Sequence, residues 1–384
     1  MTQQIGSQDL KIGYGDHVVL EDINFQLERG QILCLMGPNG SGKSTLIKTL
    51  IHQQKKLGGK IYLEEKEMES LKNIERASKM SAVLTERLSL DLMTAEEIVA
   101  TGRFPYTNFL GKLEEEDFQA IDQALDMVKA QAIKDRPFSQ LSDGQKQRIM
   151  LARAICQGAD IMILDEPTSF LDVRYKIEIL GILKNLSRQM NKTLILSLHE
   201  IDLISKIADQ VLQINGDQTY SYGSPDQVLK DQAIKAAFSI KEGSYSSLLG
   251  NIELEAPKGE AKVFVVGGCG RGIKTYRRLN KEGVAFYAGI LFENDLDLAV
   301  ARPLAKKTLV EKAFRDISQD TIQRAKDLID QVDYVLDVGA DFVGANRGNQ
   351  ALLDYSLKKA KKLIFLKERP GYGASSSYQL EDLL

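Results

Sequence analysis

The chain lacks three features that would place it in a specialised class of protein. Its 384 residues contain no apolar run of the roughly 18 residues that a membrane span needs. Its three cysteines, Cys34, Cys156 and Cys269, lie far apart, so a disulfide framework is not expected. Its 50 basic and 53 acidic side chains give a formal net charge of −3, which argues against nucleic acid as the main partner.

The first residues, MTQQIGSQDLKIGYG, also lack the basic and apolar regions of a signal peptide. We therefore expect a protein of a reducing compartment that is free in the cytosol or held at a membrane by partners. The length is typical of two domains. The hydrophobic content of 43% and the charged content of 27% are those of globular chains rather than disordered ones.

Strand-like and helix-like segments alternate through the first part of the chain. The apolar runs 31–37, 161–167 and 193–200 are separated by helical patterns, which predicts a parallel sheet covered by helices. Residues 9–27 and 60–63 predict a flanking antiparallel sheet. The amphipathic stretch 114–135 begins with acidic residues, as an exposed helix does, and predicts a helical subdomain.

A segment rich in glycine, serine and proline interrupts this pattern at 239–259 and is predicted to be a linker. We therefore expect one domain over 1–238 and a second over 260–384. The second domain is predicted to be a small Rossmann-like, doubly wound parallel sheet. Its five expected strands are 262–266, 285–292, 308–310, 333–338 and 361–367.

Residues 37–44, GPNGSGKS, fit the phosphate-loop pattern G-x-x-x-x-G-K-[ST] between a predicted strand and a predicted helix. Glycines let backbone N–H groups turn toward phosphate oxygens, and the helix N-terminus favours the same negative charge. Lys43 is expected to reach the β- and γ-phosphates, and Ser44 to ligate Mg²⁺. The predicted nucleotide-binding residues here are Gly37, Pro38, Asn39, Gly40, Ser41, Gly42, Lys43, Ser44 and Thr45.

The run IMILDE places Asp165 and Glu166 at the carboxyl end of a buried strand, which is the edge where α/β sheets bind ligands. Asp165 suits a Mg²⁺ role, and Glu166 is placed to polarise an attacking water. A hydrophobic run that ends in two acids is common by itself. Paired with a phosphate loop, it predicts a hydrolytic site.

The sequence LSDGQ at 141–145 completes a set of motifs that resembles the nucleotide-binding subunits of ABC transporters. The resemblance covers residues 9–238 and implies ATP and Mg²⁺ as cofactors. It also implies a head-to-tail homodimer, in which Ser142, Gly144 and Gln145 of one copy close over the γ-phosphate held by the other. One position departs from the family's LSGGQ, since Asp143 stands where the family has glycine.

Four more positions carry roles that the resemblance implies. His199 resembles the switch histidine that contacts the γ-phosphate, and Asp172 resembles the loop that links the two ATP sites. Tyr14 resembles the aromatic side chain that stacks on adenine, with a partly buried strand residue as the alternative reading. Thr85 stands where the family has a glutamine that senses Mg²⁺ and water, and either Thr85 or Glu86 is expected to replace it.

The stretch MTAEEIVATGRFPY at 93–106 resembles the segment of iron–siderophore, haem and cobalamin importers that faces the membrane subunit. The resemblance assigns Arg103 and Tyr106 to that interface. It implies an ATPase at the cytoplasmic face of the membrane, bound to a permease dimer and served by an extracytoplasmic substrate-binding protein. A soluble ABC ATPase and a metabolite sensor are the alternatives that the sequence leaves open.

The predicted second domain offers one weaker candidate site. Its glycine-rich loop, 267–272, follows a strand and opens a helix, but it does not fit the dinucleotide pattern G-x-G-x-x-G. Glu293 and Asp295 follow the next strand, where a ribose-binding acid sits in dinucleotide domains, and 337–346 could close the same crevice. The alternative is a tight glycine turn that binds nothing.

Overall fold

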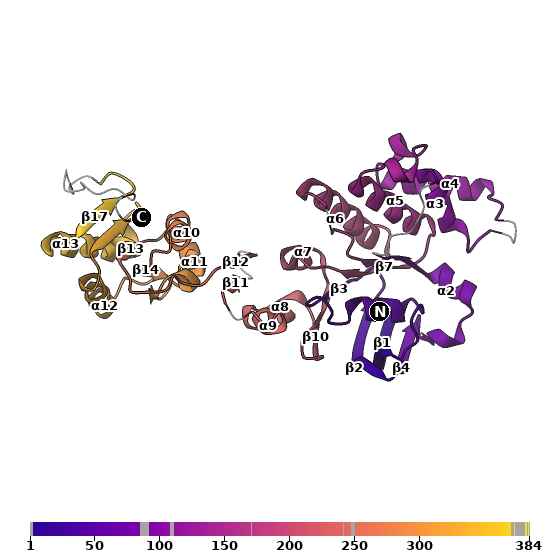
Figure 1. Ribbon diagram of the computed structural model, residues 1–384, viewed down its shortest axis with the longest axis horizontal. Coiled ribbons are helices and arrows are strands. Elements are labelled where there is room, and N and C mark those ends of the chain that lie inside the picture. The colour runs from indigo at the N-terminus through magenta and orange to yellow at the C-terminus, as the bar shows by residue number, and fades with distance from the viewer. Residues whose placement is uncertain are drawn as a thin grey trace. The chain divides into compact units, whose positions relative to one another are not determined.

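A computed structural model describes residues 3–84, 92–107, 111–169, 171–240, 242–246, 250–369, 372, 381 and 383. The chain divides into an N-terminal unit, Met1–Ser239, and a C-terminal unit, Ile240–Leu384 (Figure 1). Among the described residues, no helix has both the length and the apolar character that crossing a membrane requires.

The N-terminal unit is built on two sheets. A four-stranded antiparallel sheet has the order β2-β1-β4-β5, and a six-stranded sheet has the order β10-β9-β3-β8-β7-β6 and is parallel except for β10. The first contains β1 (Gln3–Tyr14), β2 (His17–Glu28), β4 (Gly58–Leu63) and β5 (Lys66–Glu67). The second contains β3 (Ile32–Met36), β6 (Met80–Val83), β7 (Ile161–Asp165), β8 (Thr193–Ser197), β9 (Gln210–Ile214) and β10 (Tyr220–Gly223).

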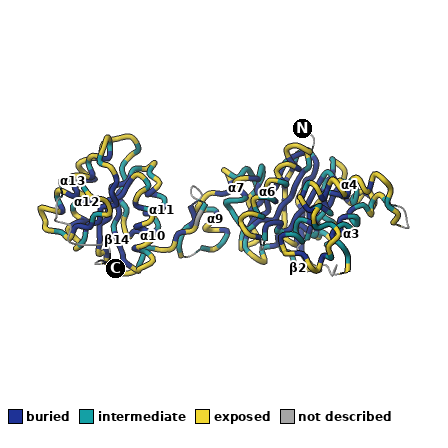
Figure 2. Tube along the Cα trace, turned by 90° about the horizontal axis from the view of Figure 1, so that it is seen from above, coloured by how far each residue is buried: buried dark blue, intermediate teal, exposed yellow. Residues whose placement is uncertain are grey.

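The central strands of the larger sheet are buried along their whole length and are mostly apolar, as parallel strands covered on both faces should be (Figure 2). Helices α3, α4 and α5 pack on one another as the predicted helical subdomain (Figure 1). The helices of this unit are α1 (Lys43–Leu50), α2 (Asn73–Lys79), α3 (Ala95–Ala100), α4 (Glu115–Met127), α5 (Asp143–Cys156), α6 (Val173–Arg188), α7 (Ile201–Ile207), α8 (Pro225–Val228) and α9 (Asp231–Ala237).

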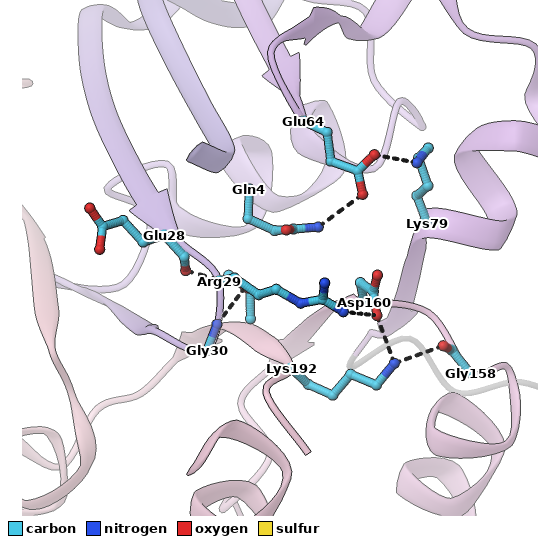
Figure 3. Close-up of polar contacts among 10 residues, drawn as sticks. Gln4, Glu28, Arg29, Gly30, Glu64, Lys79, Gly158, Asp160 and Lys192 are labelled. Atoms are coloured by element: carbon cyan, nitrogen blue, oxygen red, sulfur yellow. Dashed lines mark hydrogen bonds and ion pairs between the residues drawn. The ribbon is translucent and has the colours of Figure 1, made fainter. Parts of the chain in front are cut away.

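Polar contacts around Asp160 fasten the edge of the sheet where β7 and β8 begin (Figure 3). The Lys192 ammonium donates to the Asp160 carboxylate and to the Gly158 carbonyl, each at 2.9 Å. The Arg29 guanidinium approaches the same carboxylate at 3.4 Å. Charged groups therefore hold the amino ends of these strands together, while the carboxyl ends are left for other side chains.

The C-terminal unit contains a five-stranded parallel sheet of order β15-β14-β13-β16-β17, which confirms the predicted doubly wound domain. Alternate residues of β13 enter two separate apolar clusters, so both faces of the sheet are covered. The strands are β13 (Val263–Val266), β14 (Phe286–Phe292), β15 (Lys307–Glu311), β16 (Tyr334–Asp337) and β17 (Lys362–Phe365). The helices are α10 (Ile273–Lys281), α11 (Leu296–Leu304), α12 (Gln319–Asp330) and α13 (Gln350–Lys358).

The segment predicted as a linker, 239–259, carries secondary structure of its own. It contains a short antiparallel pair, β11 (Ser244–Ser246) and β12 (Asn251–Glu253). Glu253 is buried and forms an ion pair with Arg277 of α10, which ties this hairpin to the C-terminal unit. Composition predicted the glycine-rich turns here, but not this ion pair.

Glu311 at the end of β15 provides a pH-dependent contribution to the stability of the C-terminal unit. Its carboxylate accepts hydrogen bonds from the Ser318 backbone N–H at 3.0 Å and hydroxyl at 2.9 Å, and from the Lys312 backbone N–H at 3.2 Å. These bonds lower the pKa of Glu311 from its ordinary 4.5 to about 2. The contribution is therefore complete above pH 4.5 and is lost as the pH falls toward 2.

We expect Glu311→Gln to destabilise the C-terminal unit at pH 7 by about 1 kcal/mol, because a charged acceptor is replaced by a neutral one. The difference from the unaltered chain should shrink as the pH falls below 4.5. Scanning calorimetry of the full chain measures both effects. Glu282→Gln, at an exposed position after α10, is the control, and an equal loss in that variant would contradict the assignment.

Candidate functional site

The phosphate-loop pattern lies where the sequence predicts it, between β3 and α1. Gly37, Gly40 and Gly42 have φ angles of 153°, 79° and 108°, which are strained for any residue with a side chain. These angles curl the loop over the N-terminus of α1. The first backbone N–H groups of a helix lack intrahelical partners, so a turn of this shape is suited to bind an anion.

The Lys43 side chain lies inside this loop. Its ammonium donates to the carbonyls of Gly37 at 2.8 Å and Pro38 at 2.9 Å. Burial lowers the pKa of Lys43, and the nearby carboxylates of Glu166 and Asp165 offset part of this effect. The loop therefore holds a cation near its centre, as a phosphate site requires.

Two of the residues predicted to hold Mg²⁺, Ser44 and Asp165, lie close together in the fold. The Ser44 hydroxyl, at the start of α1, donates to the Asp165 carboxylate at 3.4 Å, at the end of β7. Both groups offer the hard oxygen atoms that Mg²⁺ prefers. The Ser41 hydroxyl is buried in the same loop and has no hydrogen-bond partner within the described ranges, so it is available to a bound phosphate. The residues present thus fit a nucleotide with Mg²⁺.

Glu166 and His199 form a direct pair at the same edge of the sheet. The His199 Nε2 lies 2.5 Å from one carboxylate oxygen of Glu166, and the Ser169 hydroxyl donates to the other at 2.8 Å. Burial raises the pKa of Glu166, but these two hydrogen bonds outweigh it and the net shift is downward. Glu166 is therefore an ionised and oriented carboxylate that can accept a proton from water.

Tyr14 ends β1 beside the phosphate loop. Its hydroxyl lies 3.3 Å from the Thr45 hydroxyl, and 48% of the residue is exposed. Tyr14 is thus a partly buried residue at the end of a strand, as the alternative reading describes, and its role in stacking on adenine stays a prediction. An exposed ring next to a phosphate loop is placed to stack on a base.

The signature residues lie at the start of α5 and cap that helix. The Ser142 hydroxyl accepts from the Gln145 N–H at 3.4 Å, and the Gln145 side chain accepts from the Ser142 N–H at 3.0 Å. Gly144 leaves room for the Tyr175 ring, since a Cβ there would lie 3.2 Å from it. Within the part of the chain that the structure describes, no hydrogen bond of Ser142 or Gln145 reaches the phosphate loop.

Of the remaining predicted positions, the structure describes Asp172 but not Thr85 or Glu86. Asp172 is the N-cap of α6, where its carboxylate accepts from the Tyr175 N–H at 3.0 Å. Thr85 and Glu86 lie outside the described residues, so the predicted replacement of the family's glutamine stays a prediction.

Arg103, which the resemblance assigned to a membrane-subunit interface, is used inside the helical subdomain. Its guanidinium donates to the Asp117 carboxylate at 2.7 Å and to the Cys156 carbonyl at 3.1 Å, and it lies over the Tyr106 ring. The Arg103 side chain is only 15% exposed. Phe104 and Tyr106 are 63% and 46% exposed, so these aromatic residues, rather than Arg103, present a surface.

Sequence reasoning missed a cavity of about 460 Å³ in the N-terminal unit. Arg153 of α5 lies in its wall and donates through Nε to the Thr101 hydroxyl at 2.8 Å. Arg76 of α2 also lines it and donates to backbone carbonyls. Among the described residues neither arginine has a carboxylate partner. The rest of the lining mixes apolar and polar side chains: Leu50, Ile51, His52, Met68, Asn73, Ala77, Met80, Ala82 and Gln157.

The glycine-rich loop of the C-terminal unit, 267–272, is already occupied by the chain's own carboxylates. Asp297 accepts from the Gly268 N–H at 2.7 Å, and Asp295 accepts from the Cys269 N–H at 2.8 Å. Two more backbone N–H groups of the loop bind the same two side chains. These are the donors that a pyrophosphate would need, so Asp295 serves the loop and not a ribose.

Two glycines of this loop are explained by packing. A Cβ at Gly267 would lie 1.9 Å from the Tyr276 hydroxyl, and one at Gly272 would lie 2.4 Å from the same ring. Tyr276 is fully buried and stacks on Phe286 at a centroid distance of 5.5 Å. The arrangement fits the alternative reading, a tight glycine turn whose glycines are explained by packing.

Comparisons with known proteins agree with this geometry. The ABC transporter family model matches residues 20–169, and the MJ0874 family model matches residues 286–383. An uncharacterized ABC transporter ATP-binding protein of Methanocaldococcus jannaschii is 40% identical over 276 residues, which span 72% of this chain and 95% of that protein. The iron(3+)-hydroxamate import ATP-binding protein FhuC of Bacillus subtilis is 31% identical over 62% of this chain and 88% of its own length.

Solved structures lead to the same fold. CbiO1 of Clostridium perfringens, part of the ABC transporter complex CbiONQ, matches with a TM-score of 0.54 at 26% identity. The match covers 61% of this chain and 93% of that structure. The predicted P-loop fold and the family resemblance stated from the sequence are both confirmed by these matches.

The Tyr276 hydroxyl gives a test of the C-terminal loop. It is buried without a hydrogen-bond partner among the described residues, so Tyr276→Phe should leave stability unchanged or raise it by about 1 kcal/mol. Thermal unfolding of the full chain measures this. In Tyr287→Phe, the control, a hydrogen bond to Gln331 is lost and a small destabilisation is expected. A clear destabilisation by Tyr276→Phe would mean that the hydroxyl has a partner.

Proposed function

The chain belongs to the ATP-binding, ATP-hydrolysing subunits of ABC transporters, and from this premise we propose that it powers import of an iron–siderophore complex through a membrane permease. The observation that carries the hydrolytic part of the proposal is the Glu166–His199 pair at 2.5 Å, on the same sheet edge as the phosphate loop. Relatives named for siderophore and iron-hydroxamate import support this cargo class. Haem and cobalamin are the alternative cargoes.

In the proposed reaction the N–H groups of the phosphate loop and Lys43 bind the ATP phosphates, and Tyr14 contacts the base. Ser44 and Asp165 would hold Mg²⁺, which neutralises charge on the transferred phosphoryl group. Glu166 accepts the proton of the attacking water, and His199 keeps that carboxylate ionised and oriented.

The signature residues Ser142, Gly144 and Gln145 require a second copy of the chain in this proposal. They lie at the N-terminus of α5, where the helix dipole favours an anion and Ser142 is exposed. The side chains of Ser142 and Gln145 make no hydrogen bond to the chain's own phosphate loop within the described residues. A twofold, head-to-tail dimer would bring this helix end to the γ-phosphate of the partner's site. Asp172 would lie between the two sites.

We also propose that the cavity lined by Arg76 and Arg153 receives a segment of the permease at the cytoplasmic face of the membrane. Its wall mixes apolar and polar side chains, and two guanidinium groups there have no carboxylate partner among the described residues. A short apolar helix that carries an acidic side chain would complement both features. Thr101 of the importer-like stretch 93–106 holds Arg153 in place, which links this stretch to the cavity.

The catalytic proposal is tested with Glu166→Gln in the full chain. We expect ATP to bind and the dimer to accumulate, because the uncharged amide cannot accept the proton, with hydrolysis lowered at least about a hundredfold. Gel filtration with ATP measures the dimer, and uptake of radiolabelled ferric siderophore by cells measures transport. Glu65→Gln, in an exposed turn, is the control.

The outcomes separate mechanism from cargo. If Glu166→Gln binds ATP but elutes only as a monomer on gel filtration, the dimer mechanism is contradicted. Unchanged siderophore uptake, with hydrolysis abolished in vitro, would keep the ATPase and redirect the cargo to haem or cobalamin.

The cavity is tested with Arg153→Glu, which places a negative charge where an acidic segment is proposed to bind. We expect recovery of the membrane subunit from detergent-solubilised membranes to fall about tenfold, while ATP binding by the purified chain is unchanged. Arg148→Glu, on the same helix and outside the cavity lining, is the control. Full recovery of the membrane subunit with Arg153→Glu would rule out this cavity as the contact.

A further inference from the structure

Glu200 follows His199 directly and begins α7, but its side chain does not cap that helix. Its carboxylate instead accepts from the Thr168 hydroxyl at 3.2 Å and from the Lys176 ammonium at 2.5 Å. Thr168 belongs to the loop that follows β7, and Lys176 lies in the first turns of α6. One carboxylate therefore joins the loop after β8 to the loop after β7 and to a helix.

This contact and the Glu166–His199 contact are reciprocal. The loop after β7 supplies the acceptor Glu166 to His199, and the loop after β8 supplies the acceptor Glu200 to Thr168. Each loop thus contributes one glutamate and one partner to the other loop. The two contacts are two residues apart on the loop after β7 and one residue apart on the loop after β8. Together they fix both the distance between the loops and their relative rotation.

The surroundings favour a rigid arrangement. Thr168 is 1% exposed, and the side chains of Glu200 and Lys176 are 32% and 27% exposed, so the ion pair is partly shielded from water. Glu166 has a φ of 50°, in the left-handed region that residues with side chains seldom adopt. A backbone in that region persists where surrounding contacts hold it. The hydrogen bond between Thr168 and Glu200 is such a contact, two residues after Glu166.

We propose that Glu200, with Lys176 and Thr168, is a positioning residue of the ATPase site. It holds His199 at the distance and angle at which Glu166 stays ionised and faces the attacking water. The proposal rests on the proposed roles of Glu166 and His199. Glu200 lies beside the reacting groups and acts through His199, so its loss should slow the chemical step without weakening ATP binding.

The test measures kcat and KM for ATP in the full chain carrying Glu200→Gln, Lys176→Met or Thr168→Val. We expect kcat to fall at least about tenfold in Glu200→Gln and Lys176→Met, with KM within about twofold of the unaltered chain. The unfolding temperature should stay within about 2 °C. Thr168→Val removes one hydrogen bond and keeps the ion pair, so a smaller fall in kcat is expected.

Arg174→Met is the matched control, because Arg174 forms an ion pair with Glu178 on the same helix, at 3.3 Å, and has no hydrogen bond or ion pair with either loop among the described residues. An unchanged kcat in Glu200→Gln, with Glu166→Gln inactive, would overturn the positioning role and leave the proposed ATPase chemistry intact. A rise in KM equal to the loss in kcat/KM, or an equal fall in kcat in Arg174→Met, would also overturn it. Full activity in Glu166→Gln would overturn the chemistry and this role together.

Discussion

The hydrogen-bonded register of three parallel strands is the constraint on which the site in the N-terminal unit depends. β8 lies between β3 and β7, with Leu35 and Asp165 both opposite Ser197. Because the strands are parallel and in this register, the segments that follow them leave the sheet at one edge. The phosphate loop, Glu166 and His199 come from parts of the chain that are far apart in sequence, and only this register brings them together.

The two units use a glycine-rich turn after a strand in opposite ways. In the N-terminal unit the turn after β3 contains a lysine and a buried serine hydroxyl, and its helix end is open to an anion. In the C-terminal unit the turn after β13 is filled by two carboxylates of the chain, Asp295 and Asp297, and burial raises the pKa of Asp297. The physical requirement is the same, since backbone N–H groups at such a turn need negatively charged or polar partners. What differs is whether the protein or a ligand supplies them.

This contrast explains how much could be predicted from the sequence. The phosphate loop was predictable because lysine and serine follow the glycines at fixed spacing, and each has a defined chemical task. Glu166 was predictable because a buried apolar run ends there. The hydrogen bonds from the glycine-rich loop to Asp295 were not predictable from the sequence. An acid after the second strand of a doubly wound sheet can bind either a ribose or the protein's own backbone N–H groups. Spacing alone does not distinguish the two, whereas hydrogen-bond geometry does.

Arg103 and Arg153 show a similar limit in the helical subdomain. The family resemblance assigned Arg103, together with Tyr106, to the interface with the membrane subunit, and it gave Arg153 no role. In the fold, Asp117 neutralises Arg103 inside the subdomain, whereas Arg153 lines the cavity, where burial lowers its pKa. A guanidinium kept in such a cavity without a carboxylate among the described residues is costly unless an anionic group binds there. The sequence names the residue types of such a motif, whereas only the fold shows that Arg103 is paired with a carboxylate and that Arg153, among the described residues, is not.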